Sequence, residues 1–232
     1  MALLCVWVEV SGLAPISIKY FMSNIPEYYQ HGRTEMFPFI PPTIRKVLDV
    51  GCGAGAFGFN LKTQFNCEVW GVEMNSAAAA RASMVLDKVI CSEFNASCFP
   101  QDPQFDCIFF NDVLEHMNSP EDALKLAKDL LLPNGAIVAS IPNIRHFSVI
   151  WDLIINGEWK YQDAGILDRT HLRFFTRKTI VRFFEAVPLN VTKCQGINPR
   201  FVGRKHRLLN AFFPSAFSDM KFEQFAVVGR VI

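Results

Sequence analysis

The chain lacks an excess of charge of either sign. Its 232 residues carry 23 Lys and Arg against 22 Asp and Glu, which gives a formal net charge of +1. So close a balance provides no long-range attraction to nucleic acid or to an anionic membrane surface. We therefore expect a small or uncharged partner and no nucleic acid.

Paired cysteines are also missing. The seven cysteines are scattered along the chain, and none belongs to a CxxC pair. The odd number and irregular spacing fit neither a disulfide framework nor a zinc site. We expect mostly small buried thiols in a reducing compartment, which favours the cytoplasm, and no metal site.

Long apolar runs are absent as well. No stretch reaches the roughly 18 apolar residues that a membrane span needs. The apolar start carries Glu9 early and has no basic segment, which is unlike a signal peptide. Residues 1–24 do not resemble the rest of the chain, and we treat them as an extension of unknown role. Because half of the residues are hydrophobic, residues 25–232 are expected to form one domain with a large core.

What the chain does contain is an alternation of short apolar strands with helices. Strands are predicted at 46–50, 67–73, 88–94, 105–112, 136–142, 190–197 and 222–232. Helices are predicted from within 51–58 to about residue 64, and at 75–86, 119–131 and 176–186. Strands that alternate with helices indicate parallel βαβ units, and apolar strands without alternation indicate a sheet covered on both faces. We expect a doubly wound, Rossmann-like α/β fold with ligands beyond the carboxyl ends of the strands.

A glycine loop, GCGAG at 51–55, follows the first predicted strand directly. Such a loop lets backbone N–H groups and a helix N-terminus approach a ligand closely. Gly53, Gly55 and Gly58 also match GxGxxG, so an NAD-dependent dehydrogenase is one alternative. Asp49 argues against it, because a carboxylate there repels a pyrophosphate and attracts an ammonium group. The loop therefore favours a nucleoside with a positive amino-acid moiety.

Glu73 ends the second predicted strand, in WGVE. A carboxylate at this place is the expected acceptor for ribose hydroxyls. It would serve a dinucleotide equally well, so Glu73 supports a nucleoside ligand without choosing between the candidates.

These motifs as a set resemble the class I S-adenosylmethionine-dependent methyltransferases. The resemblance rests on VLDVGCGAG, GVE, FDCIFFNDVLEHM and LLLPNGAIVASIPN, and it covers about residues 45–145. It implies a seven-stranded, mostly parallel sheet whose last strand is antiparallel. It also implies S-adenosyl-L-methionine as the cofactor.

The same resemblance implies which residues bind the cofactor. They are Asp49, Gly51, Cys52, Gly53, Gly55, Glu73, Met74, Glu93, Phe94, Asn111 and Asp112. Those up to Gly55 would hold the methionine end, and Glu73 would hold the ribose. Met74 and the pair Glu93 and Phe94 would lie at the adenine, although the family usually has Gly-Asp where this chain has Ser-Glu. Asn111 and Asp112 would line the cofactor near its methionine part.

A second segment, DAGILDRTHLRFFT at 163–176, concentrates acids, arginines and a histidine among apolar residues. Residues 145–175 resemble a subset of the family with a G-I-L-D-x-T-H-x-R-F-F-T motif, whose members often accompany sugar and surface-polysaccharide synthesis. The resemblance suggests a small or glycan-like acceptor. The aromatic stretch 146–161 suits a cover over an acceptor pocket, and a flap that only packs on the sheet is the alternative.

Transfer of a methyl group to a hydroxyl needs a base near the hydroxyl proton, and histidine is best tuned for that task. We expect His171 to be the base and Asp168 to orient it. His116 and His146 also fall near the predicted site, and we interpret both as structural, with His116 forming a hydrogen bond at a helix start.

Two arginines of the segment have two possible roles. Arg169 and Arg173 would bind a phosphate or carboxylate of the acceptor, or they would pair with Asp163 and Asp168.

The sequence therefore predicts a cytoplasmic S-adenosylmethionine-dependent methyltransferase that acts on a small or sugar-containing acceptor at oxygen. A cofactor-binding sensor, or a module that supports a partner enzyme without turnover, is the alternative from a different class.

Overall fold

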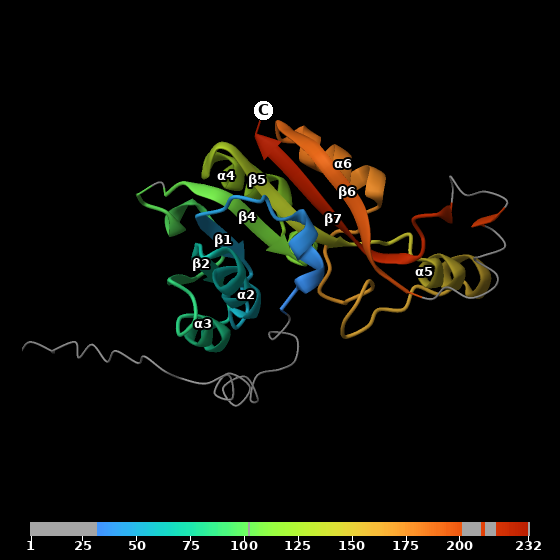
Figure 1. The fold of residues 1–232 in the computed structure, drawn as a ribbon. Coiled ribbons are helices and arrows are strands. Elements are labelled where there is room, and N and C mark those ends of the chain that lie inside the picture. The colour runs from blue at the N-terminus through green and yellow to red at the C-terminus, as the bar shows by residue number, and fades with distance from the viewer. Residues whose placement is uncertain (1–31, 102, 201–209, 212–216, 232) are drawn as a thin grey trace, which may run out of the picture.

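A seven-stranded sheet forms the centre of the computed structural model, which describes residues 32–101, 103–200, 210–211 and 217–231 (Figure 1). The strands are β1 (Lys46–Val50), β2 (Glu68–Glu73), β3 (Lys88–Cys91), β4 (Phe105–Asn111), β5 (Leu131–Pro142), β6 (Leu189–Pro199) and β7 (Phe222–Val231). Their order is β3-β2-β1-β4-β5-β7-β6. Neighbours from β3 to β5 are parallel, and β7 is antiparallel to β5 and β6. The predicted fold is thereby confirmed, while the predicted extension 1–24 lies outside the described residues.

Helices cover both faces of this sheet. They are α2 (Ala56–Phe65), α3 (Ser76–Ala82), α4 (Pro120–Asp129), α5 (Phe147–Trp151) and α6 (Arg177–Ala186), with short turns η2 (Thr34–Phe39), η3 (Ala96–Cys98), η4 (Leu114–His116) and the π-helical η5 (Asp152–Asn156). Side chains of α4 and α6 pack on one face, and those of α2 and η2 pack on the other. Phe109 and Phe110 of β4 are both fully buried, one in each core. A strand buried on both faces has no need of alternating polarity.

Local signals set several ends of these elements. The Asn75 side chain accepts two backbone N–H groups of the first turn and caps α3. The helix ends at Ala82, earlier than predicted, where the Ser83 hydroxyl bonds the carbonyl of Ala80. Such a bond competes with the helical backbone pattern. Ser119 occupies the N-cap position of α4, but its side chain makes no capping bond.

The segment 145–175 connects β5 to α6. From β5 it enters α5, which extends away from the sheet, and then returns as a loop (Figure 1). The carbonyl of Glu115 accepts the N–H groups of Leu172 and Arg173 at 2.8 and 3.1 Å. Phe175 is buried against α6, with its ring 5.4 Å from that of Phe183. The loop is therefore fastened over the carboxyl ends of β4 and β5.

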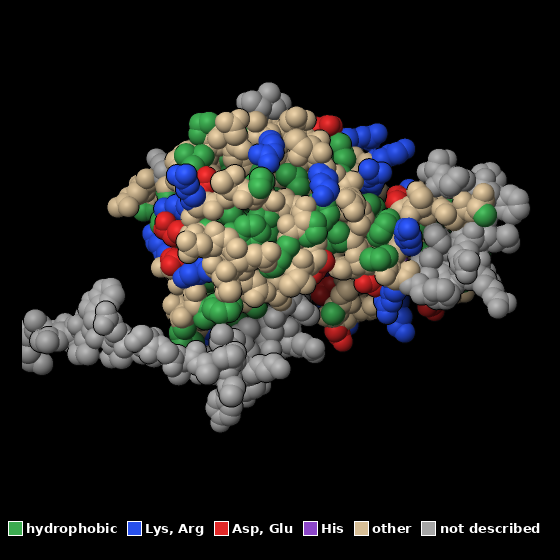
Figure 2. Space-filling model, in the orientation of Figure 1, with side chains coloured by type: hydrophobic (Ala, Val, Ile, Leu, Met, Phe, Trp, Pro, Cys, Tyr) green, Lys and Arg blue, Asp and Glu red, His purple; other side chains and the backbone are tan. Residues whose placement is uncertain are grey.

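The distribution of charged and apolar side chains can be compared with the partners expected from the sequence. On the face shown in Figure 2, Lys and Arg side chains are scattered and do not gather into one patch. None of the helices in the described ranges combines the length and apolar character required to cross a bilayer. Cysteines in those ranges are free thiols.

Candidate functional site

The glycine loop turns sharply between β1 and α2. Gly51, Gly53 and Gly55 have φ angles of 70°, 54° and 85°, in the left-handed region that favours glycine. A Cβ on Gly51 would come within 2.6 Å of the Val113 side chain. The loop thus needs glycine for its conformation, and its bare backbone leaves room for a ligand to approach.

Two buried carboxylates flank this loop. Glu73 accepts the N–H groups of Gly53 and Asn75 at 2.9 and 2.8 Å. Asp49 is only 2% exposed, and its carboxylate makes no hydrogen bond or ion pair within the described part of the chain. Burial raises the pKa of Asp49 to about 8; the charge of Glu73 adds to this effect and that of Arg33 opposes it. A buried carboxylate without a cation is well suited to bind an ammonium group.

Asn111 and Cys52 complete this edge of the sheet. Asn111 ends β4, and both polar atoms of its buried amide lack a partner among the described residues. Unpartnered buried polar groups are costly and often mark a ligand site. Cys52 is buried in the loop, and burial raises the pKa of its thiol.

The predicted adenine contacts lie further out. Met74 is 71% exposed, and Glu93 is exposed beyond the end of β3, which stops at Cys91 and not at residue 94 as predicted. Phe94 is half-buried and packs edge-on against the rings of Phe99 and Phe110. Phe94 therefore has a role in the core whatever it binds.

A cavity of about 290 Å³ opens beside the ends of β4, β5 and β7. Much of its wall comes from segment 145–175. Its carboxylate and guanidinium groups belong to five acidic residues and one arginine, which are Asp112, Glu115, Asp152, Asp168, Glu223 and Arg200. Arg200 is paired with Glu223 at 2.8 Å. This excess of acids disfavours a phosphate or carboxylate as the bound group.

The two arginines of the segment face elsewhere. Arg169 pairs with Asp163 at 2.7 Å on the surface. Arg173 donates to the backbone carbonyls of Leu172 and Asn118. Neither arginine lines the cavity, so their contacts are structural.

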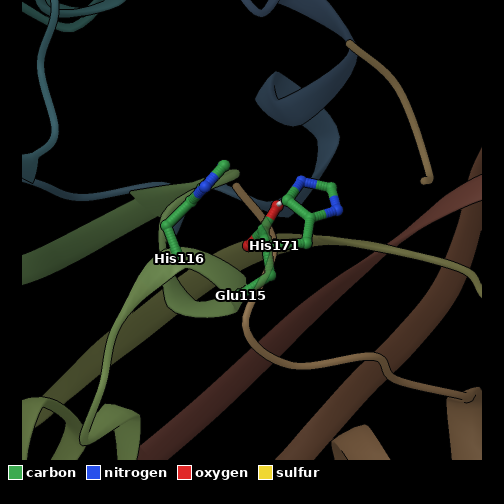
Figure 3. Close-up of side chains that lie close together, drawn as sticks. All are labelled: Glu115, His116 and His171. Atoms are coloured by element: carbon green, nitrogen blue, oxygen red, sulfur yellow. Dashed lines mark ion pairs between the residues drawn. The ribbon is translucent and has the colours of Figure 1, made fainter. Parts of the chain in front are cut away.

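Glu115 is a buried carboxylate in the cavity wall. It is 1% exposed, and neither of its oxygens has a hydrogen-bond partner among the described residues. Burial raises its pKa well above the ordinary value. Figure 3 shows its carboxylate between the rings of His116 and His171, and its Oε1 lies 3.9 Å from Nε2 of His171. Sequence reasoning missed Glu115, because nothing in NDVLEH indicates which acid is buried.

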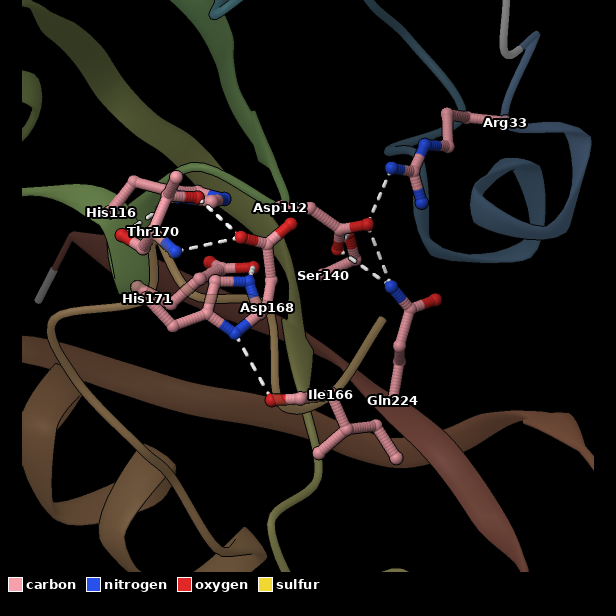
Figure 4. Close-up of polar contacts among 10 residues, drawn as sticks. Arg33, Asp112, His116, Ser140, Ile166, Asp168, Thr170, His171 and Gln224 are labelled. Atoms are coloured by element: carbon pink, nitrogen blue, oxygen red, sulfur yellow. Dashed lines mark hydrogen bonds and ion pairs between the residues drawn. The ribbon is translucent and has the colours of Figure 1, made fainter. Parts of the chain in front are cut away.

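His171 is 8% exposed and is held by a backbone carbonyl (Figure 4). Its Nδ1 lies 3.1 Å from the oxygen of Ile166, so a neutral ring donates there and keeps a free lone pair on Nε2. Asp168 instead accepts the N–H and the hydroxyl of Thr170, at 2.7 and 2.6 Å. The tight turn directs this carboxylate to Thr170 and not to the ring of His171, so the orienting role of Asp168 stays a prediction.

Two pKa shifts set the charges of these groups. Burial lowers the pKa of His171, and a positive charge on His116 lowers it further, while the hydrogen bond with Ile166 opposes both. Burial alone would raise the pKa of Asp168, but the hydrogen bonds from Thr170 outweigh it and leave the pKa below its ordinary value. At neutral pH His171 is therefore uncharged and Asp168 is ionised.

His116 is linked to the same loop. It ends η4, and its Nδ1 lies 3.0 Å from the Thr170 hydroxyl. Because that hydroxyl donates to Asp168, its oxygen accepts from Nδ1–H of His116, which leaves Nε2 free. The rings of His116 and His171 are 4.6 Å apart. The interpretation of His116 as a helix-start hydrogen bond is therefore wrong.

Asp112 lines the cavity and forms hydrogen bonds with other parts of the chain. It follows β4 with a left-handed φ of 55°. Its carboxylate accepts from Ser140 at 2.6 Å and from Gln224 at 2.7 and 2.8 Å, and it pairs with Arg33 at 2.5 Å (Figure 4). These partners come from three distant parts of the chain, and sequence reasoning found none of them.

Comparison with known families identifies one that spans most of the chain. Residues 21–193 match the model of a family described as "Methyltransferase domain". The chain is 24% identical over 172 residues to a ubiquinone biosynthesis O-methyltransferase of Burkholderia orbicola, covering 72% of this chain and 73% of the relative. Its identity to the protein of that name from Pasteurella multocida is 32% over 130 residues, covering 50% and 52%.

Solved structures agree with this fold. A SAM-dependent methyltransferase from Archaeoglobus fulgidus superposes with a TM-score of 0.61 at 16% identity, covering 84% of this chain and 91% of the other. One from Aquifex aeolicus gives 0.58 at 14% identity, covering 95% and 100%.

Proposed function

Because the chain belongs to the methyltransferase-domain family and is an S-adenosylmethionine-dependent methyltransferase, we propose that it methylates an oxygen of a small hydroxylated acceptor. The acceptor binds in the cavity of about 290 Å³ that Asp112 and His171 line. The observation that carries this proposal is the buried imidazole of His171 in the wall of that cavity, held through Nδ1 by the carbonyl of Ile166.

The proposed cofactor site is the edge formed by the glycine loop and the ends of β1, β2 and β4. Asp49 binds the ammonium group of the methionine part, and the Gly51–Gly55 backbone surrounds that end. Glu73 accepts the ribose hydroxyls, since each oxygen uses only one lone pair on the backbone. The buried, unpartnered amide of Asn111 supports a polar ligand here. Met74, Glu93 and Phe94 are the proposed adenine contacts.

Cofactor binding is expected to depend on pH through Asp49. Its pKa of about 8 means that the carboxyl is mostly protonated at pH 7 without ligand. Binding an ammonium group requires the ionised form, so the affinity rises with pH up to about 8 and then levels off. We expect the Kd for S-adenosylhomocysteine to fall by roughly tenfold from pH 6 to pH 7, measured by titration calorimetry. A flat profile would contradict the assignment of Asp49.

The proposed chemistry needs a positioned acceptor and a destination for its proton. S-adenosylmethionine, when bound, supplies a methyl group on a positive sulfur. The acceptor oxygen forms a bond to the methyl carbon as the carbon–sulfur bond breaks, and the hydroxyl proton passes to Nε2 of His171. Ile166 keeps Nδ1 protonated, so that Nε2 remains the free base. Asp168 accepts the hydroxyl of Thr170, and that hydroxyl in turn bonds Nδ1 of His116, so Asp168 positions the ring of His116.

Size and charge support a particular class of acceptor. The cavity is at the small end of ligand pockets. Its carboxylates favour hydroxyl groups as hydrogen-bond donors over anionic groups. The O-methyltransferase relatives support transfer to oxygen. The GILDRTHLRFFT segment supports a sugar-containing acceptor within the hydroxylated class, with 145–175 as the cover of the pocket.

The proposal is tested with trideuteromethyl-labelled cofactor and a panel of neutral sugars, phenols, amines and sugar phosphates. We expect label on an oxygen of a neutral hydroxylated compound, located by mass spectrometry and NMR. Label found only on nitrogen, or on phosphorylated acceptors alone, would overturn the assigned class. Cofactor that binds but is never consumed in extract would support a sensor instead.

A further inference from the structure

We propose that Glu115, His116 and His171 bind one divalent transition-metal ion in the wall of the acceptor cavity. A carboxylate oxygen of Glu115 and one nitrogen of each histidine lie within 4.8 Å of one another (Figure 3). The three residues come from η4 and from the loop fastened over it. Cysteine spacing predicted no metal, and this ligand set contains no cysteine.

Both histidines are prepared to bind an ion through Nε2. A histidine that binds a metal usually donates its other ring N–H to a carbonyl or carboxylate, which fixes the tautomer. Nδ1 of His171 bonds the carbonyl of Ile166. Nδ1 of His116 bonds the hydroxyl of Thr170, which in turn donates to Asp168. The Asp-x-Thr-His sequence of the loop thus supplies one ligand and the support for another.

The carboxylate between these rings has no other partner. Both oxygens of Glu115 are buried without a hydrogen bond in the described part of the chain. The 3.9 Å from its Oε1 to Nε2 of His171 is too long for a hydrogen bond. The carboxyl group of Glu115 and the two free ring nitrogens therefore face one another without a hydrogen bond among the described residues. A cation resolves this arrangement, since buried charges in proteins are paired or coordinate metals.

The ligand types select the class of ion. Two imidazoles and one carboxylate suit zinc, manganese, cobalt or ferrous iron better than calcium or magnesium, which prefer oxygen ligands. Ligands of a tetrahedral ion at about 2.1 Å stand about 3.4 Å apart. The side chains would therefore move inward by at most about 1.5 Å from their present separations.

A bound ion would change how the proposed acceptor site works. This inference rests on the proposed function, because the ion would face the acceptor through its open positions. A hydroxyl oxygen on the ion loses its proton to water more readily, since the ion stabilises the resulting oxyanion. His171 then serves as a ligand, and the ion takes over the activation of the hydroxyl.

The test measures metal binding apart from turnover. The full chain, dialysed against chelator, is titrated with Co²⁺ by absorption spectroscopy and with Zn²⁺ by calorimetry. We expect one ion per chain, with visible bands typical of nitrogen and oxygen ligands. Glu115→Gln should weaken Zn²⁺ binding by at least about 100-fold, since even changes to supporting residues cost 10–100-fold. Glu223→Gln, the same charge change elsewhere in the cavity wall, should alter it by less than about threefold.

S-adenosylhomocysteine binding serves as the control for folding, because the three proposed ligands line the acceptor cavity. No saturable binding of either ion, or equal losses in Glu115→Gln and Glu223→Gln, would overturn the metal site. Full turnover by chelated protein that contains no metal would overturn the role of the ion in activating the hydroxyl and leave the proposed function standing. Stoichiometric metal in an enzyme that methylates no hydroxyl would support the site and overturn the proposed function.

Discussion

Replacing His171 with alanine is expected to reduce kcat by roughly 10²- to 10⁴-fold, the usual cost of losing a group that manages a proton in the transition state. The affinity for S-adenosylhomocysteine should stay within about twofold, because His171 lies on the acceptor wall of the cavity. The loss should therefore appear in the chemical step and not in cofactor binding. Single-turnover kinetics with an identified acceptor, together with calorimetry, checks both expectations.

A matched control lies next to this residue. Leu172 is 46% exposed and lies outside the cavity lining, so Leu172→Ala should change kcat by less than about twofold. The pH profile provides a second check. Since burial lowers the pKa of His171, kcat/KM should be constant near neutrality and fall only below pH 6.5. Normal turnover by His171→Ala would remove this residue from the mechanism, whether as base or as ligand.

Replacing Asp49 with asparagine is expected to weaken S-adenosylhomocysteine binding by about 100-fold or more. The variant leaves the cofactor ammonium without its buried counter-charge, and breaking a buried pair costs roughly 3–5 kcal/mol. Calorimetry at pH 8 measures the effect best, since Asp49 has a pKa of about 8 and is substantially ionised there.

The same substitution should act in the opposite direction on the unliganded protein. The pKa of Asp49 is raised from 3.8 to about 8, so the folded state resists ionisation and the free energy of unfolding falls as pH rises between those values. Asparagine removes that loss, and Asp49→Asn should unfold at a higher temperature than the parent at pH 8. Weaker binding in a more stable protein excludes misfolding as the cause, whereas unchanged affinity would contradict the ammonium assignment.

The cofactor edge could be predicted from the sequence because its signals are local. A buried strand that runs into GCGAG dictates a turn with left-handed backbone, and the structure has it at Gly51, Gly53 and Gly55. Strand ends carry Asp49 and Glu73 to the same edge, because parallel strands present their carboxyl ends together. The short range of these constraints is the reason why the motif and the fold agree.

The acceptor wall could not be predicted, because it is assembled from distant parts of the chain. Asp112 bonds residues 28, 79 and 112 positions away. The carboxylate of Glu115 meets His171 only after the loop folds over β4. Proximity in sequence also did not reveal that the tight turn would direct the carboxylate of Asp168 to Thr170 and not to the ring of His171.

The two hydrogen bonds from Leu172 and Arg173 to the carbonyl of Glu115 have a consequence for exchange with solvent. They are the backbone contacts that fasten the loop to η4 beside His171. Lifting of the loop breaks both, and their amide protons then become free to exchange with deuterium. The exchange rate of these amides therefore reports how often the loop lifts away from η4. An acceptor or ion bound in the cavity beneath the loop will slow that exchange.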